Sequence, residues 1–262
     1  MERVLRFFRR IIFFYKRSSI LADWKNFIII DLVTPSLQML CFSLIGYYVY
    51  GAENIFKWMI GNTLLISSFG ALYRVGLQIF NEKSSGTLSL LIATKTKLAE
   101  IFFSSAVFTM ITSFFSVGIG VTLLSFLFNI SWSIEKICNF CIVLIFAIFS
   151  VMCFGFLFSC FILVTTEIHL VINTTERILL IFTGANFSTE QLPVVLKNFS
   201  SILPLTNSIK AAQRLLKEEN ILNSIDLIKN EFMIGIIYLL IGIIILGQIE
   251  KIAIKNGNID II

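Results

Sequence analysis

The sequence predicts an all-α integral membrane protein with six transmembrane helices in a single domain, residues 1–262. Hydrophobic residues make up 57% of the chain and charged residues only 14%. The mean hydropathy of +0.90 places the chain among membrane proteins. The chain also contains several apolar runs of about 20 residues, which is the length that a helix needs to cross a hydrocarbon core of about 30 Å.

The segment 1–26 combines basic side chains with aliphatic and aromatic ones at roughly helical spacing. No separate apolar stretch follows the basic residues, so this segment is not a cleavable signal peptide. We expect an amphipathic helix in the membrane interface, with its basic face toward headgroups and its aromatic face toward acyl chains. A disordered basic leader is the alternative.

Six segments are predicted to cross the membrane. Three of them, 101–128, 137–164 and 232–249, contain no charged residue. A fourth, 170–187, is more polar and is assigned partly because the chain must return between its neighbours. The full set of predicted spans is 27–50, 56–80, 101–128, 137–164, 170–187 and 232–249.

The loops differ in their content of Lys and Arg. Seven of these residues lie in 1–26, three in 81–100 and two after residue 249, against one each in 51–57 and 129–136. Because cytoplasmic loops are enriched in Lys and Arg, we expect both termini and the loop 81–100 to be cytoplasmic. The net charge of +5 is thereby explained by membrane topology, and nucleic acid is not an expected partner.

The segment 188–231 is then external, and it contains two prolines that end or kink any helix they enter, Pro193 and Pro204. Apolar and basic residues after Pro204 recur at helical spacing. We expect two short interfacial or re-entrant helices here, with the prolines at an external gate. Non-helical breaks at membrane depth survive only beside protein or a water-filled cavity.

Charged side chains also fall inside predicted spans, where lipid opposes them by about 2.5–3.5 kcal/mol each. Arg74 lies in 56–80, and Asn173, Glu176 and Arg177 share one helical face in 170–187. One hypothesis is that they line a substrate pathway or a dimer interface. The alternatives are a structural ion pair, such as Glu176 with Arg74, or a position nearer the cytoplasmic end of the membrane than the predicted span limits imply.

Several kinds of chemistry are missing from the chain. It contains no G-x-x-x-x-G-K-[ST] loop that could bind a nucleotide, and only one histidine. The short loops offer no pair of carboxylates and no nucleophile beside a base. We therefore expect no catalytic residue, no metal site and no cofactor in this chain.

The loop after the second predicted span reads NEKSSGTLSLLIATK over residues 81–95. Ser84, Ser85 and Gly86 should end the preceding helix, because Gly readily adopts the left-handed conformation of helix ends. Its E-x-x-x-G-T-L-x-L-L pattern resembles the signature of ABC-2-type transporter permeases. A second similarity follows in order along the chain, at Gly184, Leu192–Pro193, Leu203–Pro204 with Thr206, and Arg214.

This resemblance implies that the loop forms a short coupling helix against a separate ATPase. The residues expected to contact the ATPase are Glu82, Gly86, Thr87, Leu88 and Leu91. The resemblance further implies an exporter built from two permease copies or paralogues and two ATPase subunits, with ATP and Mg bound only by the ATPases. Drugs, antimicrobial peptides, lipids and lipid-linked glycans are the expected substrate classes.

The abundance of Phe, Ile, Lys and Asn indicates an AT-rich bacterial genome, so we expect the plasma membrane of a bacterium. The alternative from another functional class is an ATP-independent membrane protein, either a secondary transporter or an immunity protein that sequesters a toxin. A secondary transporter would show internal repeats with broken helices.

Overall fold

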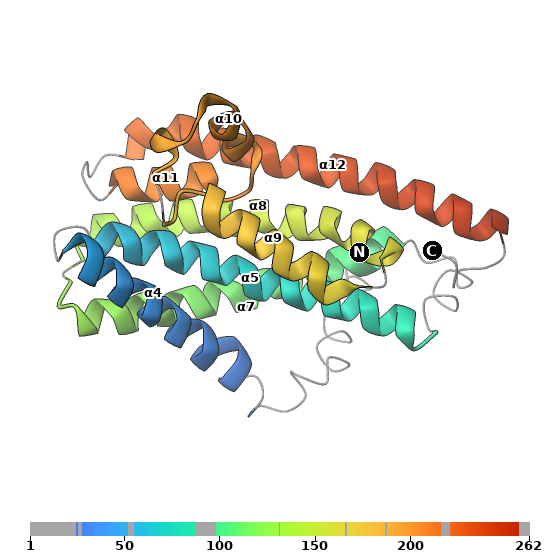
Figure 1. Cartoon of the computed structure of the whole chain (residues 1–262), viewed down its shortest axis with the longest axis horizontal. Helices are drawn as coiled ribbons and strands as arrows, with labels where there is room; N and C mark the ends of the chain where they lie inside the picture. Colours follow the sequence, from blue (N-terminus) through green and yellow to red (C-terminus); the bar gives the residue numbers. More distant parts are fainter. Residues whose placement is uncertain are drawn as a thin grey trace, which may run out of the picture.

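The computed structural model describes Lys25 and residues 28–51, 55–86, 98–130, 132–165, 167–186, 188–215 and 221–256. Within these residues every regular element is a helix, which confirms the all-α fold class. Long helices lie side by side in a bundle, and short helices gather at one of its ends (Figure 1). The predicted interfacial helix over 1–26 falls outside the described residues, apart from Lys25.

The first described element is a π-helix, η1 (Ile28–Val33), which continues into α4 (Thr34–Tyr50). Pro35 lies at the start of α4 and has no N–H to donate to the preceding turn. The Thr34 hydroxyl donates to the Ile29 carbonyl oxygen at 2.9 Å. The irregular π register therefore lies directly before a proline, and prolines are tolerated in transmembrane helices where side chains and local changes of register satisfy the freed backbone groups.

Three long helices form the centre of the bundle: α5 (Ile55–Ser84), α7 (Leu98–Leu127) and α8 (Ile134–Val164). The first of these has an unbroken buried run from Met59 to Ser68. The helix α8 contacts α5, α7 and α12, so its side chains supply much of the hydrophobic core. Its first turn is capped by the Ser133 hydroxyl, which accepts from the Lys136 N–H.

The second half of the chain alternates long and short helices. It contains α9 (Ile168–Phe182), η3 (Thr189–Gln191), α10 (Val194–Ile202), α11 (Thr206–Leu215), η4 (Ile221–Ser224) and α12 (Ile225–Asn256). The short helices α10 and α11 lie at the end of the bundle where α5 begins, opposite the end where α5 stops (Figure 1). We call α10, α11 and the turn between them the outer cap.

In the part of the chain that the structure describes, three helices contain segments that are long and apolar enough to cross a membrane: Met110–Leu127, Ile134–Val164 and Leu222–Ile249. The helix α4 has 17 residues and α9 only 15, fewer than the roughly 20 that a bilayer core requires. The helix α5 is longer but contains charged residues at both ends. The count of six spans therefore stays a prediction.

The helix ends differ from the predicted span limits. The last helix begins at Ile225, inside the segment 188–231 that we expected to be external loop, because hydropathy detects the apolar centre of a helix and not its polar first turns. The helix α9 ends at Phe182, earlier than predicted, and Gly184 follows with φ 85. The helix α5 continues to Ser84, into the predicted loop 81–100, and α7 begins at Leu98.

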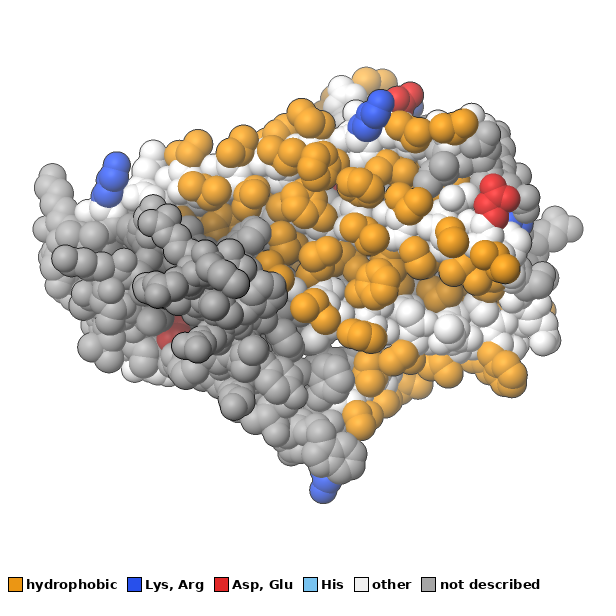
Figure 2. Space-filling view, turned by 180° about the vertical axis from the view of Figure 1, so that it is seen from behind, with side chains coloured by type: hydrophobic (Ala, Val, Ile, Leu, Met, Phe, Trp, Pro, Cys, Tyr) orange, Lys and Arg blue, Asp and Glu red, His pale blue; other side chains and the backbone are white. Residues whose placement is uncertain are grey.

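Apolar side chains cover the sides of the bundle. Figure 2 shows them over most of the described part of one face, with the charged side chains near its edges. Only 22% of the residues in the most apolar stretch of α12 are buried within the chain, so most of that stretch faces outward. A large exposed apolar surface of this kind is expected where acyl chains replace water.

Tyr and Trp side chains gather at the outer-cap end, where α4 ends and α5 and α8 begin. The rings of Tyr50 and Trp58 stack with centroids 5.0 Å apart, and Trp132 meets Phe56 edge-on at 5.0 Å. Tyr and Trp are enriched at the headgroup level of membranes. We therefore expect this cluster to lie at the level of one membrane interface.

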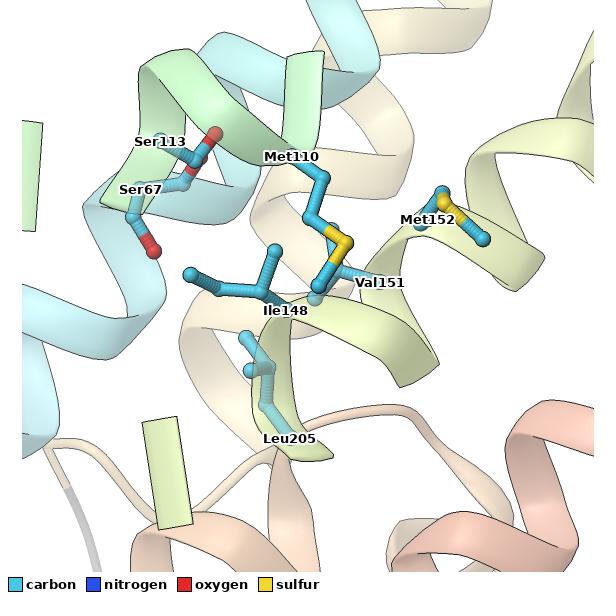
Figure 3. Close-up of a pocket in the computed structure, with 7 residues that line it drawn as sticks. All are labelled: Ser67, Met110, Ser113, Ile148, Val151, Met152 and Leu205. Atoms are coloured by element: carbon cyan, nitrogen blue, oxygen red, sulfur yellow. The ribbon is translucent and has the colours of Figure 1, made fainter. Parts of the chain in front are cut away.

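The centre of the bundle is tightly packed. A cavity of about 10 Å³ lies where α5, α7 and α8 meet the outer cap, a volume that holds about one water molecule. The Ser113 hydroxyl donates across it to the Ser67 carbonyl oxygen at 3.4 Å. Figure 3 shows its lining residues, which are Ser67, Met110, Ser113, Ile148, Val151, Met152 and Leu205. Among the described residues, the space at this level is therefore small.

The outer cap is held by Glu231, which is 0% exposed. One oxygen of its carboxyl group accepts the Leu205 N–H at 2.7 Å, and the other accepts the N–H groups of Asn207 and Ser208 at 3.1 and 3.2 Å. The Leu205 N–H lies directly before α11, and the Asn207 and Ser208 N–H groups belong to its first turn. The first N–H groups of a helix have no partner within that helix. Leu205, directly before the helix, has an apolar side chain that cannot cap it, so Glu231 supplies the acceptor from α12.

We predict that Glu231→Ala lowers the free energy of unfolding by about 3–5 kcal/mol, because three buried N–H groups lose their acceptor. Glu231→Gln keeps one amide oxygen and should lie between the alanine variant and the wild type. The thermal midpoint in dodecyl maltoside micelles measures the effect.

Asp226→Asn is the matched control, since Asp226 is an exposed acid on the same helix. Its thermal midpoint should stay close to that of the wild type. Equal midpoints for Glu231→Ala and Asp226→Asn would contradict the structural role of Glu231.

Candidate functional site

The end of α5 carries the residues that the sequence assigns to a coupling element. Glu82 is only 4% exposed although it lies in the last turn of the helix. The helix ends at Ser84, and Gly86 follows with φ 65, in agreement with the predicted break. The Gly86 N–H donates to the Lys83 carbonyl oxygen at 3.1 Å. The left-handed glycine therefore sets the direction in which the chain leaves the bundle.

The coupling loop itself continues beyond the described residues. Thr87, Leu88 and Leu91 all fall in 87–97, so their assignment as ATPase contacts stays a prediction. Glu82 and Gly86 are the two members of the predicted set that the structure places. They lie at the end of the bundle that is opposite the outer cap (Figure 1).

Lys83 connects this end of α5 to the end of α8. Its ammonium group donates to the Leu163 carbonyl oxygen at 2.7 Å and lies 3.5 Å from the Thr165 carbonyl oxygen. The last carbonyl groups of a helix have no partner in their own helix, and a cation there is favoured by the helix dipole. Partial burial lowers the pKa of Lys83.

Lys83 had no role of its own among the residues predicted from the sequence. The only sequence signal for a role of Lys83 was its position, one residue after Glu82 and three residues before Gly86. That position places it in the final helical turn, but the carbonyl groups it meets are far away in the sequence.

The polar residues of α9 lie on a partly exposed face. Asn173 and Arg177 are exposed and Glu176 is half-buried, whereas Ile172 and Leu179 are buried. The structure thus keeps the predicted polar side chains on one helix and outside the hydrophobic core.

The fourth member of this group, Arg74, lies in α5, but its side chain is outside the part of the chain that the structure describes. An ion pair between Arg74 and Glu176 therefore stays a prediction, as does a role in a pathway.

The two prolines assigned to an external gate occupy different environments. Pro193 is exposed and directly precedes α10, whereas Pro204 is buried in the turn between α10 and α11. After Pro204, Leu205 adopts φ 72, which is unfavourable for a residue with a side chain. The hydrogen bond from Leu205 to Glu231 holds this conformation. Sequence reasoning missed Glu231, since an acid beside an apolar run looks like a loop residue.

We predict that Lys83→Met destabilises the contact between α5 and α8 by about 1–2 kcal/mol, because the carbonyl groups at the end of α8 lose a charged donor. Lys83→Arg should keep most of the contact. Faster amide hydrogen exchange at residues 161–168 measures the local loss.

Lys251→Met is the control, because Lys251 is an exposed lysine on α12. It should leave exchange at 161–168 unchanged. The capping role is wrong if Lys83→Met also leaves that exchange at the wild-type rate.

Comparison with known proteins supplies the family. No curated protein matches the chain. The family model described as ABC-2 type transporter matches residues 10–216. This range contains both ends of α5, the polar face of α9 and the outer cap up to the end of α11. Because the match covers more than half of the 262 residues, the chain belongs to the ABC-2 type transporter family.

Proposed function

We propose that the chain is the transmembrane permease subunit of an ATP-driven exporter. Two copies, or one copy and a paralogue, form the substrate pathway and work with two separate ATPase subunits, which bind ATP and Mg. The observation that carries this proposal is the family match over residues 10–216, together with a buried acid and a left-handed glycine at the end of α5.

The proposed membrane arrangement has six spans, formed by α4, α5, α7, α8, α9 and α12. An even number puts both termini on one side, and the Lys and Arg distribution favours the cytoplasmic side of a bacterial plasma membrane. The outer cap is then external and the end of α5 cytoplasmic. The opposite positions of these two features in the bundle support this arrangement (Figure 1).

The helix α5 is the proposed route of coupling between the two ends. It runs without a break for 30 residues, which is about 45 Å at a rise of 1.5 Å per residue. Near its outer end Gly61 packs against the backbone of Ala185, where a Cβ atom would lie 3.1 Å from the Ala185 carbonyl oxygen. The outer end of α5 also contacts α11, where the Gln213 amide nitrogen would lie 3.4 Å from a Cβ atom on Gly61. Motion of the ATPases at Glu82 and Gly86 would therefore reach the outer cap through one rigid helix.

A pathway between two copies, and not through one, fits the packing of the bundle. The small cavity between α5, α7 and α8 has about 10 Å³. The exposed polar face of α9 would be unfavourable against acyl chains and favourable against a second copy or a polar substrate. A larger groove of about 520 Å³ lies beside it, with Phe161 of α8 and Thr175 of α9 in its lining.

The test of this proposal uses the complex purified through a tag on this chain. We expect an ATPase with a G-x-x-x-x-G-K-[ST] loop to co-purify. Spin labels at the exposed Val194 of the two copies should then report an ATP-dependent change in distance at the outer cap. A stable complex without any ATPase would favour the ATP-independent alternatives.

We predict that Gly86→Ala uncouples this complex. Alanine disfavours the left-handed conformation by about 1–2 kcal/mol, so the loop direction changes. ATP hydrolysis and assembly should persist, while the ATP-dependent change at Val194 falls by about five-fold. Glu82→Gln should have the same effect through the loss of its charge.

Two control variants separate loop direction from general strain. Gly86→Asn should remain coupled, because asparagine tolerates the left-handed conformation. Gly51→Ala introduces backbone strain outside the coupling end, since Gly51 has φ 79 and ψ 171, a conformation that is essentially restricted to glycine. Like Gly86, it has no described atom within 4 Å of an added Cβ. Full coupling in both Gly86→Ala and Glu82→Gln would refute the coupling role.

We also predict that the double variant Glu176→Gln/Arg177→Gln weakens the permease dimer or the export of compounds that the wild type carries, without loss of folded yield. Light scattering and an efflux assay measure these quantities. The charge-matched control is Asp226→Asn/Lys229→Gln, an exposed acid and base on α12. Normal dimerisation and normal export in the α9 variant would exclude a role of Glu176 and Arg177 in the pathway or the dimer interface, and would leave a structural role.

A further inference from the structure

A polar cavity of about 220 Å³ opens at the outer-cap end of the bundle. It lies between the start of α5, the turn after α9 and one face of α11. We call it the outer cation pocket and define it by six of its lining residues, Lys57, Ser188, Thr189, Glu190, Lys210 and Arg214. None of the roles proposed above for coupling, dimerisation or the pathway uses these side chains.

The charges of the pocket are unbalanced. Among the described lining residues, Lys57, Lys210 and Arg214 contribute three cations, against one carboxylate, that of Glu190. Burial lowers the pKa of Lys210, Lys197 and Arg214 lower it further, and Glu190 partly opposes them. The neighbouring cations therefore disfavour one another's charged forms, and a bound anion would stabilise these charges.

The secondary structure explains why these cations converge. Lys210 and Arg214 are four residues apart on α11 and share one face, while Ile209 and Ala212 on the opposite side are buried. The Gln213 amide lies 3.5 Å from the Gly184 carbonyl oxygen, which places this face of α11 against the turn after α9. Lys57 then approaches from the first turn of α5.

The remaining polar groups suit an anion with several oxygen atoms. Ser188 and Thr189 place hydroxyl groups in the lining, and Thr189 is only 4% exposed. Arginine binds phosphate oxygens through paired N–H groups, and lysine acts as a point charge beside it. A phosphate group can use all of these donors at once.

The position of the pocket matches the depth of lipid phosphates. An adjoining cavity of about 180 Å³ shares Lys57 and Ser188 with the pocket and is lined by Tyr50 and Trp58. These stacked rings belong to the aromatic cluster that we expect at a membrane interface. The helix α10, which follows Glu190 and Pro193, also exposes apolar side chains such as Val194 and Phe199. Basic side chains and exposed apolar side chains therefore lie at the same level.

We propose that the outer cation pocket binds a phosphate group at the headgroup level of the membrane, held by Lys210, Arg214 and Lys57 with the hydroxyls of Ser188 and Thr189. This role goes beyond the transport proposal and does not depend on ATP coupling. The phosphate can belong to the headgroup of an anionic lipid or to a free phosphate ion.

The experiment uses the full chain in dodecyl maltoside micelles, which contain no phosphate. Inorganic phosphate and dihexanoyl-phosphatidylglycerol are titrated separately at constant ionic strength, and the dissociation constants are measured by calorimetry. Saturable binding of the lipid alone identifies a headgroup site. Saturable binding of both at similar affinity identifies a site for the phosphate group itself, and either result supports the proposal.

Variants test whether the binding occurs in this pocket. Lys210→Gln and Arg214→Gln should each weaken binding by about ten-fold, the effect of losing one charged hydrogen bond. Lys229→Gln removes an exposed cation of α12 that is not among the lining residues and should bind like the wild type. Glu190→Gln should bind about two- to five-fold more tightly, a gain that a damaged fold does not produce.

Two results would overturn the proposal. One is the absence of saturable binding of either ligand to the wild type. The other is an equal dissociation constant in the wild type, Lys210→Gln and Arg214→Gln, with Glu190→Gln also unchanged. Unliganded thermal midpoints of all variants show whether each of them is folded, so that a loss of binding is not mistaken for a loss of structure.

Discussion

The hydrogen bonds from Leu205 and from the first turn of α11 to the carboxyl group of Glu231 hold the outer cap in place. They satisfy backbone donors that have no partner in their own helix, at a position where the preceding residue, Leu205, has no polar side chain. Tyr238, two turns further along α12, donates to the Ile202 carbonyl oxygen at the end of α10. The cap is thereby attached to α12, which packs along α8 in the centre of the bundle.

At the opposite end of the bundle a charged side chain also satisfies backbone groups at a helix terminus, but it is a cation that binds carbonyl oxygens and not a carboxylate that binds N–H groups. There the ammonium group of Lys83 satisfies carbonyl oxygens at the end of α8. Unsatisfied backbone groups are most costly where water is scarce, so contacts of this kind are well suited to a membrane protein. Both contacts join residues that flank the proposed working parts, the coupling loop after Gly86 and the outer cap. A motion at one end would therefore be transmitted by helices that hydrogen bonds hold together, and not by flexible loops.

Much of the fold was predictable because hydropathy depends only on neighbouring residues. The all-helical class followed from long apolar runs, and the end of α5 at Ser84, two residues before Gly86, followed from the properties of glycine. Helix ends were less accurate, since the first turns of α12 are polar and resemble a loop. For the candidate site, Glu82 and Gly86 were found through a local pattern, whereas Glu231 and Lys83 were not. Their partners lie 26 and 80 residues away in the chain.

The sequence by itself determined that this chain is an all-α membrane protein of the ABC-2 type, because run length, Lys and Arg distribution and short motifs are all local properties. Only the tertiary structure decided which polar side chains meet. It joined Glu231 to the start of α11 and Lys83 to the end of α8, and it brought Lys57 of α5 beside Lys210 and Arg214 of α11. These pairings depend on how distant helices pack against one another, and no local pattern contains that information.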